Sequence, residues 1–145
     1  MILLGVDPGV KGAFALFDKG ARRVEVFDMP DTTDGLHELV RSFPPITIGM
    51  VEKPYYPKVI GVTNVARIAE AFGKILSALH WCGIPFDLVR PADWKAALNL
   101  SSSKAASREK ASQLFPDDGE QWKLAKHDGR AEAALLAWYG LGKAK

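Results

Sequence analysis

The fold of this chain is decided by ILLGVDPG, residues 2–9. The apolar run over residues 2–6 is short and predicts a strand that is buried on both faces. Pro8-Gly9 is turn chemistry, so Asp7 is expected at the end of that strand, with its carboxylate at a rim of the sheet. Taken alone, an Asp before Pro-Gly is more often a turn former than a ligand. The role of Asp7 therefore depends on which other acids meet it.

The rest of the chain predicts an α/β domain that spans residues 1–145. Two more strands follow at residues 13–17 and 22–29, and Asp18-Lys19-Gly20 between them is hairpin chemistry. Three antiparallel strands followed by alternating helices and strands predict a mixed five-stranded sheet flanked by helices, which is the element order of the ribonuclease H-like fold. The later strands are expected at 46–51 and 84–89, and the helices at 34–40, 92–98, 104–114, 128–139 and from a cap at Thr63 or Asn64 to about Trp81.

Three further acids lie where this fold would bring them to Asp7. Glu52 ends the strand at 46–51, and the first and fourth strands of the fold lie side by side. Asp128 and Glu132 begin the last helix, which packs across those strands, and their four-residue spacing puts them on one face. Taken singly, Glu52 is more often a solvated strand end, and Asp128 a residue favoured by the helix dipole. Their joint placement predicts that the acids meet.

Gathered carboxylates are the ligands that Mg2+ and Mn2+ prefer. Two such ions about 4 Å apart suit phosphodiester hydrolysis, because one serves the attacking oxygen and the other the leaving oxygen. We expect two ions per site and four acids that are both catalytic and metal-binding. Asp7 would bridge the ions, Glu52 would hold one, and Asp128 with Glu132 would hold the other. His127 is an accessory candidate that would assist a ligand or position water.

These acidic segments resemble a known family. LGVDPG at 4–9, Val51-Glu52 and HDGRAEA at 127–133 are similar to the three acidic motifs of RuvC-type Holliday junction resolvases, especially the short phage-encoded members. The resemblance covers nearly the whole chain in element order. It implies a homodimeric, Mg2+-dependent endonuclease that nicks paired strands symmetrically across a four-way DNA junction.

The chain departs from the family at its C-terminal acids. The family usually carries two aspartates three residues apart, whereas Asp128 and Glu132 are four apart and the second is a glutamate. We expect both to bind metal. The alternative is that Glu132 alone corresponds to the family's last acid and that Asp128 is only its neighbour.

Positive charge gathers beside the acids, although the net charge of the whole chain is only +2. A nuclease needs such charge because phosphate contacts supply much of its affinity for DNA. An ordinary solvated basic face is the competing interpretation. The segment Tyr55-Tyr56-Pro57-Lys58 follows Glu52, and its aromatic rings suit a wedge into the opened centre of a junction. The expected DNA-binding residues are Tyr55, Tyr56, Lys58, Lys104, Arg108, Lys110, Lys123, Lys126 and Arg130.

Composition excludes several other classes of protein. A hydrophobic share of 48% and a charged share of 25% are those of a globular domain. No stretch approaches the roughly 18 apolar residues of a membrane span, and no cleavable signal is recognisable, so we expect a cytoplasmic protein of a bacterial cell or phage-infected host with no membrane partner. The single Cys82 excludes an internal disulfide and is expected to be a packed thiol.

The long helix that follows Asn64 carries an apolar face broader than one sheet needs. Part of that face is expected to build the two-fold interface of a homodimer, which suits a symmetric junction. Trp94 is expected to pack beneath the site, and Trp81 and Trp138 in the core or the dimer interface. Two alternatives stay open: another ribonuclease H-like nuclease that acts on flap DNA or RNA–DNA hybrids, and a non-catalytic nucleic-acid-binding relative.

Overall fold

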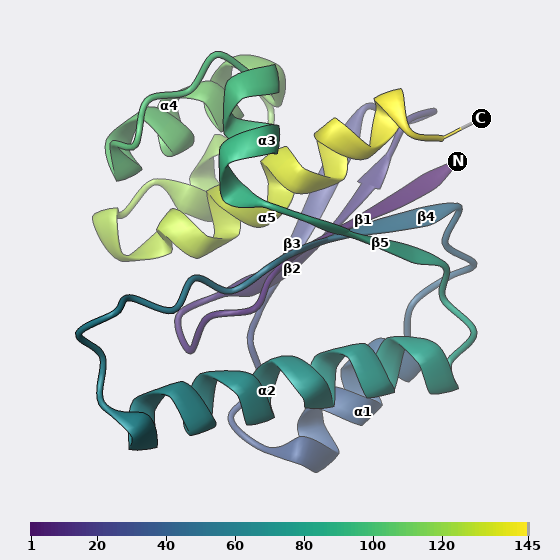
Figure 1. The fold of residues 1–145 in the computed structure, drawn as a ribbon. Coiled ribbons are helices and arrows are strands. Elements are labelled where there is room, and N and C mark those ends of the chain that lie inside the picture. The colour runs from purple at the N-terminus through teal and green to yellow at the C-terminus, as the bar shows by residue number, and fades with distance from the viewer. Residues whose placement is uncertain (145) are drawn as a thin grey trace.

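A computed structural model describes residues 1–144 and contains one mixed sheet with the strand order β3-β2-β1-β4-β5. The central strand β1 pairs antiparallel with β2 and parallel with β4. Figure 1 shows α1 and α2 on one face of the sheet and α3, α4 and α5 on the other. The strands are β1 (Ile2–Asp7), β2 (Ala13–Asp18), β3 (Arg23–Asp28), β4 (Ile48–Glu52) and β5 (Phe86–Val89), and the helices are α1 (Thr33–Arg41), α2 (Val62–Trp81), α3 (Pro91–Ala97), α4 (Lys104–Leu114) and α5 (Asp128–Tyr139).

The predicted meander, crossovers and final helix are all present, so the expected fold class is confirmed. Each face of the sheet carries its own apolar core. One core joins the sheet to α5 and its neighbours through residues such as Phe17 and Leu135, and the other joins it to α1 and α2 through Phe14 and Leu79. Because β1 lies between the two cores, Leu3, Leu4 and Val6 are fully buried, as expected for a central strand.

Helix α5 lies unusually close to β1 because small residues face each other there. A Cβ atom added at Gly5 would lie only 1.9 Å from the Ala133 carbonyl oxygen. Every residue from Ala133 to Ala137 is buried, and three of these five are alanine. The close approach brings the first turns of α5 to the end of β1, where Asp7 lies.

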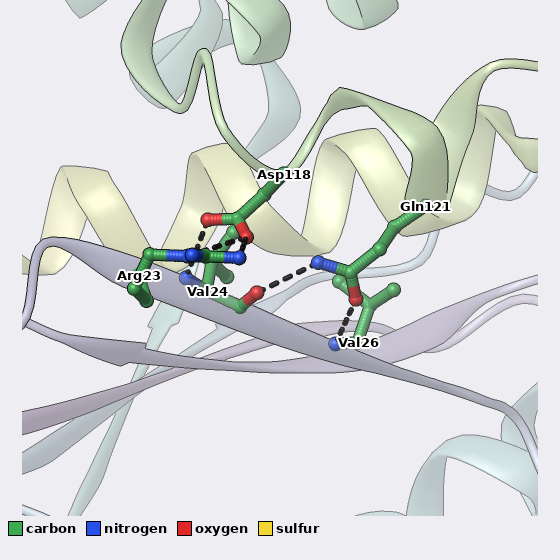
Figure 2. A network of polar contacts seen from close by, with 5 residues as sticks. All are labelled: Arg23, Val24, Val26, Asp118 and Gln121. Atoms are coloured by element: carbon green, nitrogen blue, oxygen red, sulfur yellow. Dashed lines mark hydrogen bonds and ion pairs between the residues drawn. The ribbon is translucent and has the colours of Figure 1, made fainter.

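The outer edge of the sheet is covered by side chains of the segment between α4 and α5 (Figure 2). Asp118 accepts hydrogen bonds from the Val24 backbone N–H at 3.0 Å and from the Arg23 guanidinium at 2.8 Å. Gln121, in the short helix η1 (Gly119–Trp122), accepts from the Val26 N–H and donates to the Val24 carbonyl. Backbone groups that an edge strand would leave free are thereby paired, which protects β3 from adding another strand.

No other part of residues 1–144 covers the outward face of α2. At 20 residues it is the longest helix, and Val62 and Trp81 at its two ends are 86% and 81% exposed. A Cβ at Gly73 would meet nothing within 4 Å, so this glycine serves no close contact inside the chain. No helix within residues 1–144, α2 included, is long and apolar enough to cross a membrane.

Several local predictions were wrong. Gly61, with extended backbone, precedes α2, so Thr63 and Asn64 lie inside the helix instead of capping it. Helix α4 begins after Ser103, which makes no side-chain cap bond. Cys82 is exposed and not the expected packed thiol. Trp81 is exposed too, which excludes a place in the core and leaves the expected place in a dimer interface as a prediction.

Candidate active site

Three acids from distant parts of the chain meet at one edge of the sheet. Asp7 ends β1 and Glu52 ends β4, and these strands are parallel neighbours in which Val6 pairs with Val51. The two carboxylates therefore emerge side by side, and α5 adds Glu132 from above. One carboxylate oxygen from each of the three acids lies within 4.8 Å of the others. All three side chains are partly buried.

Glu132 reaches this group because the first turn of α5 lies directly on the loop after β1. A Cβ at Gly129 would be 2.2 Å from the Lys11 carbonyl oxygen and 3.1 Å from Asp7 Oδ2, so only glycine fits there. Gly129 stands three residues before Glu132 and hence on the same helix face. The position nearest to Asp7 in the first turn is therefore occupied by a glycine and not by a second acid.

Asp128 is not part of the gathered group. Its carboxylate accepts a hydrogen bond from Arg108 Nε at 2.9 Å, and both side chains are about three-quarters covered, with 22% and 26% exposed. The pair joins α4 to α5. The structure thus brings together three of the four expected acids and engages the fourth with a cation from the chain itself.

The gathered acids carry charge that the chain compensates only in part. Burial, with a smaller contribution from the Glu132 charge, raises the pKa of Asp7 to about 6. Burial also raises the pKa of Glu52 to about 7, and the neighbouring charges of Asp7 and Glu132 act in the same direction, against the hydrogen bond from Trp94. Both shifts mean that ionising these carboxylates costs free energy when no cation is bound. A bound cation would reverse that cost.

Helix α3 supplies two neighbouring residues to this group. Trp94 is fully buried, as expected, and its indole Nε1 donates to Glu52 Oε2 at 2.6 Å. Lys95 Nζ lies 3.2 Å from Glu132 Oε1. The sequence analysis did not assign Lys95 to the site, although its position soon after β5, at the edge where β1 and β4 also end, was a usable signal.

Ser107 of α4 is a second residue that the sequence analysis missed. It is 1% exposed, and its hydroxyl lies 3.3 Å from Glu132 Oε1, in hydrogen-bonding geometry. Serine in the middle of a helix with basic neighbours gives no local signal of such a contact. Glu132 is thus held from two helices, by Ser107 and by Lys95.

The expected DNA-binding residues differ in how far they are open to solvent. Two arginines are engaged inside the chain: Arg108 with Asp128, and Arg130 with Asp28 through two hydrogen bonds of 2.7 and 2.6 Å. Lys110 is partly buried. The side chains that remain open to solvent are Tyr55, Tyr56, Lys58, Lys104, Lys123 and Lys126.

His127 immediately precedes α5 and is separate from the three acids. Within residues 1–144 its Nδ1 atom is buried and has no hydrogen-bond partner. Burial and the nearby positive charges of Arg130 and Lys126 lower its pKa. A neutral imidazole is therefore favoured at this position.

A groove of about 250 Å³ opens directly beside the acids. Asp7 and Glu52 form one wall, and Tyr55 of the loop after β4 lines it as well. Arg67 and Phe72 of α2 also line the groove. The groove combines apolar and aromatic walls with one guanidinium, next to the carboxylates.

Comparison with known proteins places the chain by its fold. No family model and no curated protein matches the sequence. Among solved structures, Thermus thermophilus RuvC in complex with a Holliday junction substrate is 15% identical, with a TM-score of 0.69, over 99% of this chain and 96% of that chain. The same protein alone is 18% identical with a TM-score of 0.68, over 100% and 99%.

Two further resolvases share the fold at greater distance. The fowlpox virus Holliday junction resolvase is 17% identical with a TM-score of 0.52, over 99% of both chains. The yeast mitochondrial Holliday junction resolvase Ydc2 is 17% identical with a TM-score of 0.51, over 94% of this chain and 75% of that one. The expected mixed five-stranded sheet flanked by helices is thus the fold of these resolvases as well. At these identities the likeness establishes the fold alone.

Proposed function

We propose that this chain is a divalent-metal-dependent endonuclease that cleaves four-way or otherwise branched DNA. The observation that carries the proposal is the group of Asp7, Glu52 and Glu132 at one edge of a fold shared with Holliday junction resolvases. The solved complex of RuvC with a Holliday junction substrate supports the choice of substrate. The proposed place of action is the cytoplasm of a bacterial cell or phage-infected host, where such DNA arises.

The donor set suits Mg2+ or Mn2+. Three carboxylates are hard oxygen ligands, and within residues 1–144 no thiol or imidazole that would select a softer metal joins them. When bound, the metal would activate a water and neutralise charge on the phosphate oxygens. We propose two ions per site, which Asp7, Glu52 and Glu132 would hold; Asp7 is the central acid of the three because it ends β1, the central strand.

Asp128 can bind metal in this proposal only if it releases Arg108. Its carboxylate already accepts from Arg108, so serving as a fourth ligand requires exchanging that guanidinium for an ion. We therefore propose Asp7, Glu52 and Glu132 as the inner set. Asp128 belongs to the set only in an arrangement in which Arg108 has moved to a DNA phosphate. His127 is proposed as an accessory group of the same region.

The chain's own cations complete the chemistry. The Lys95 ammonium beside Glu132 is placed to stabilise negative charge on a phosphate that enters the site. Burial raises the pKa of Asp7, and the charge of Lys104 on α4 opposes that rise. Tyr55 lines the groove and is 76% exposed, which suits stacking on an unpaired base at a branch point. The proposed DNA contacts also include Tyr56, Lys58, Arg108, Lys110, Lys123, Lys126 and Arg130.

We propose a homodimer built on the outward face of α2. The uncovered apolar residues at its ends and the open surface at Gly73 support this choice. Two copies related by a two-fold axis would present two sites to a symmetric junction. Sedimentation equilibrium at micromolar concentration tests it: a dimer is expected, and a monomer both with and without DNA would contradict it.

The function is tested by cleavage of a labelled four-way junction beside linear duplex, flap DNA and an RNA–DNA hybrid. Each substrate is incubated with Mg2+ or with EDTA. We expect paired nicks in the junction with Mg2+ only, and little cutting of linear duplex. Equal cutting of junction and duplex would contradict a junction-resolving role, and preferred cutting of the hybrid or flap would assign the alternative nuclease activity.

A further inference from the structure

The Glu52 carboxylate is held by a side chain whose own position is fixed. Trp94 is 0% exposed and belongs to the apolar core that joins the sheet to α5. Its indole N–H donates to Glu52 Oε2 at 2.6 Å, which is short for a hydrogen bond from nitrogen to oxygen. Side chains with a buried N–H require such an acceptor. Here the acceptor is one of the three proposed metal ligands.

Donor and acceptor lie on rigid elements that are joined over a few residues. Glu52 pairs with Val89 at the end of β5, and the Lys53 N–H donates to the Val89 carbonyl at 2.8 Å. The chain then passes directly through Arg90 into α3, which begins at Pro91. Trp94 is five residues from the strand partner of Glu52. The geometry between indole and carboxylate is therefore set by the sheet, and a mobile loop plays no part in it.

The hydrogen bond also determines which lone pairs of the Glu52 carboxylate remain free to bind a cation. The indole N–H occupies one lone pair of Oε2 and fixes the plane of the carboxylate. Outer hydrogen-bond partners of this kind orient metal ligands, and losing one weakens metal affinity by about 10- to 100-fold. Phenylalanine would fill most of the same space but leave Glu52 free to rotate.

We infer that Trp94 is a positioning residue of the metal site, which holds Glu52 in a single orientation for the cation through its indole N–H. This inference rests on the proposed function, because it takes Glu52 as a ligand. It predicts that the N–H of Trp94, apart from the volume of its ring, contributes to metal affinity.

The test compares two tryptophan variants in the full chain. Trp122 is a matched control: it is 1% exposed, lies in the same core, and its Nε1 donates to Ser112 Oγ at 3.0 Å, away from the acids. Mn2+ affinity is measured by electron paramagnetic resonance for the wild type, Trp94→Phe and Trp122→Phe, and urea unfolding is measured for each. We expect both variants to lose stability, and only Trp94→Phe to bind Mn2+ about 10- to 100-fold more weakly.

A second measurement needs no folded variant at position 94. The four tryptophans give four indole N–H signals in a 1H–15N spectrum, and the Trp94 signal is assigned by elimination from Phe variants of the other three. Titration with Mg2+ is expected to shift the Trp94 signal and to leave that of Trp122 in place.

The outcomes separate the inference from the proposed function. Wild type that binds no Mn2+ at millimolar concentration would overturn both the metal site and the role of Trp94. Wild type that binds Mn2+, together with wild-type affinity in Trp94→Phe or an unmoved Trp94 signal at saturation, would overturn the role of Trp94 alone. Equal loss of affinity in Trp122→Phe would do the same, because it would show a general effect of core damage.

Discussion

Asp7 and Asp118 are both acids that lie at the sheet and are shielded from water, but they differ in how many hydrogen-bond donors the chain supplies to their carboxylates. Asp118 is 3% exposed, and its two oxygens accept from the Arg23 guanidinium and the Val24 N–H, so its charge is compensated within the fold. Asp7 accepts one backbone hydrogen bond of 3.3 Å from Gly9 and lies within a group of acids. The difference fits the proposed function, in which Asp118 stabilises the fold and Asp7 holds a cation.

The largest expected effect comes from removing the charge of Asp7. Asp7→Asn should lower junction cleavage by about a thousandfold or more, because a single lost electrostatic stabiliser already costs 10²–10³ and Asp7 is proposed to serve both ions. Binding of the junction should persist, since the exposed basic residues are unchanged. Single-turnover cleavage and gel-shift assays measure the two properties.

Asp118→Ala tests the other acid of this comparison, for which we expect a loss of stability and no loss of cleavage. It should destabilise the protein by about 2–3 kcal/mol in urea unfolding, because it leaves the Val24 N–H unpaired and removes a charged hydrogen bond. Cleavage per folded molecule should stay near wild type. A loss of cleavage comparable to that of Asp7→Asn would contradict the division between the two acids.

The next effect separates Glu132 from Asp128. We expect Glu132→Gln to lower cleavage by about a hundredfold and Asp128→Asn by about tenfold or less, because only Glu132 lies in the gathered group. Single-turnover rates at saturating Mg2+ measure both. Equal losses would show that Asp128 exchanges Arg108 for an ion during the reaction.

A pH effect follows from the raised pKa values of Asp7 and Glu52. The folded protein binds protons at these acids more tightly than the unfolded chain does, since their ordinary values are 3.8 and 4.5 and their folded values are about 6 and 7. Stability of the metal-free protein should therefore fall as the pH rises from about 4 to about 7. Mg2+ competes with those protons, so its stabilising effect should be larger at pH 8 than at pH 5.5.

Thermal unfolding with Mg2+ and with EDTA at the two pH values measures this effect. At a hundredfold excess over the dissociation constant, the metal should add about 2.7 kcal/mol at pH 8. The control is the double variant Asp7→Asn with Glu52→Gln, which should show no increment at either pH. An equal increment at both pH values in the wild type would mean that the metal binds elsewhere.

The smallest expected effect concerns the aromatic loop. Tyr55→Ala should weaken junction binding by about tenfold, within the 1–3 kcal/mol that base stacking supplies, and should leave binding of linear duplex unchanged. Val59→Ala in the same loop region is the control, because Val59 is 96% exposed and outside the groove. Equal weakening on both DNA forms would assign Tyr55 to general affinity.

The positions of site residues were most predictable from the sequence where an apolar run ends on an acid. Asp7 and Glu52 follow apolar runs, and pairing of β1 with β4 follows from the element order, so their meeting was predictable. Helical spacing placed Glu132 near them. The same spacing gave no information on Arg108, which is 20 residues from Asp128 in the chain and changes what that acid does.

The charged contacts of the site that sequence reasoning missed join side chains that are far apart in the sequence. Lys95 and Glu132 are brought together only by packing of α3 beside α5. Arg130 donates a hydrogen bond to Asp28, which is 102 residues away in the sequence. A periodic pattern predicts which face of a helix is buried, but not which charged groups meet at its border. The signals for Trp94 were its size and place beneath the site, while its hydrogen bond to Glu52 depends on exact geometry at the end of β4.

The most direct test of the central claim is an anomalous difference map from crystals soaked in Mn2+. The account predicts density for one or two ions bound by Asp7, Glu52 and Glu132, at carboxylate distances of about 2.2 Å, and none at Asp118. Crystals that hold no ion among these three acids at saturating Mn2+, or that hold it only elsewhere, would contradict the account.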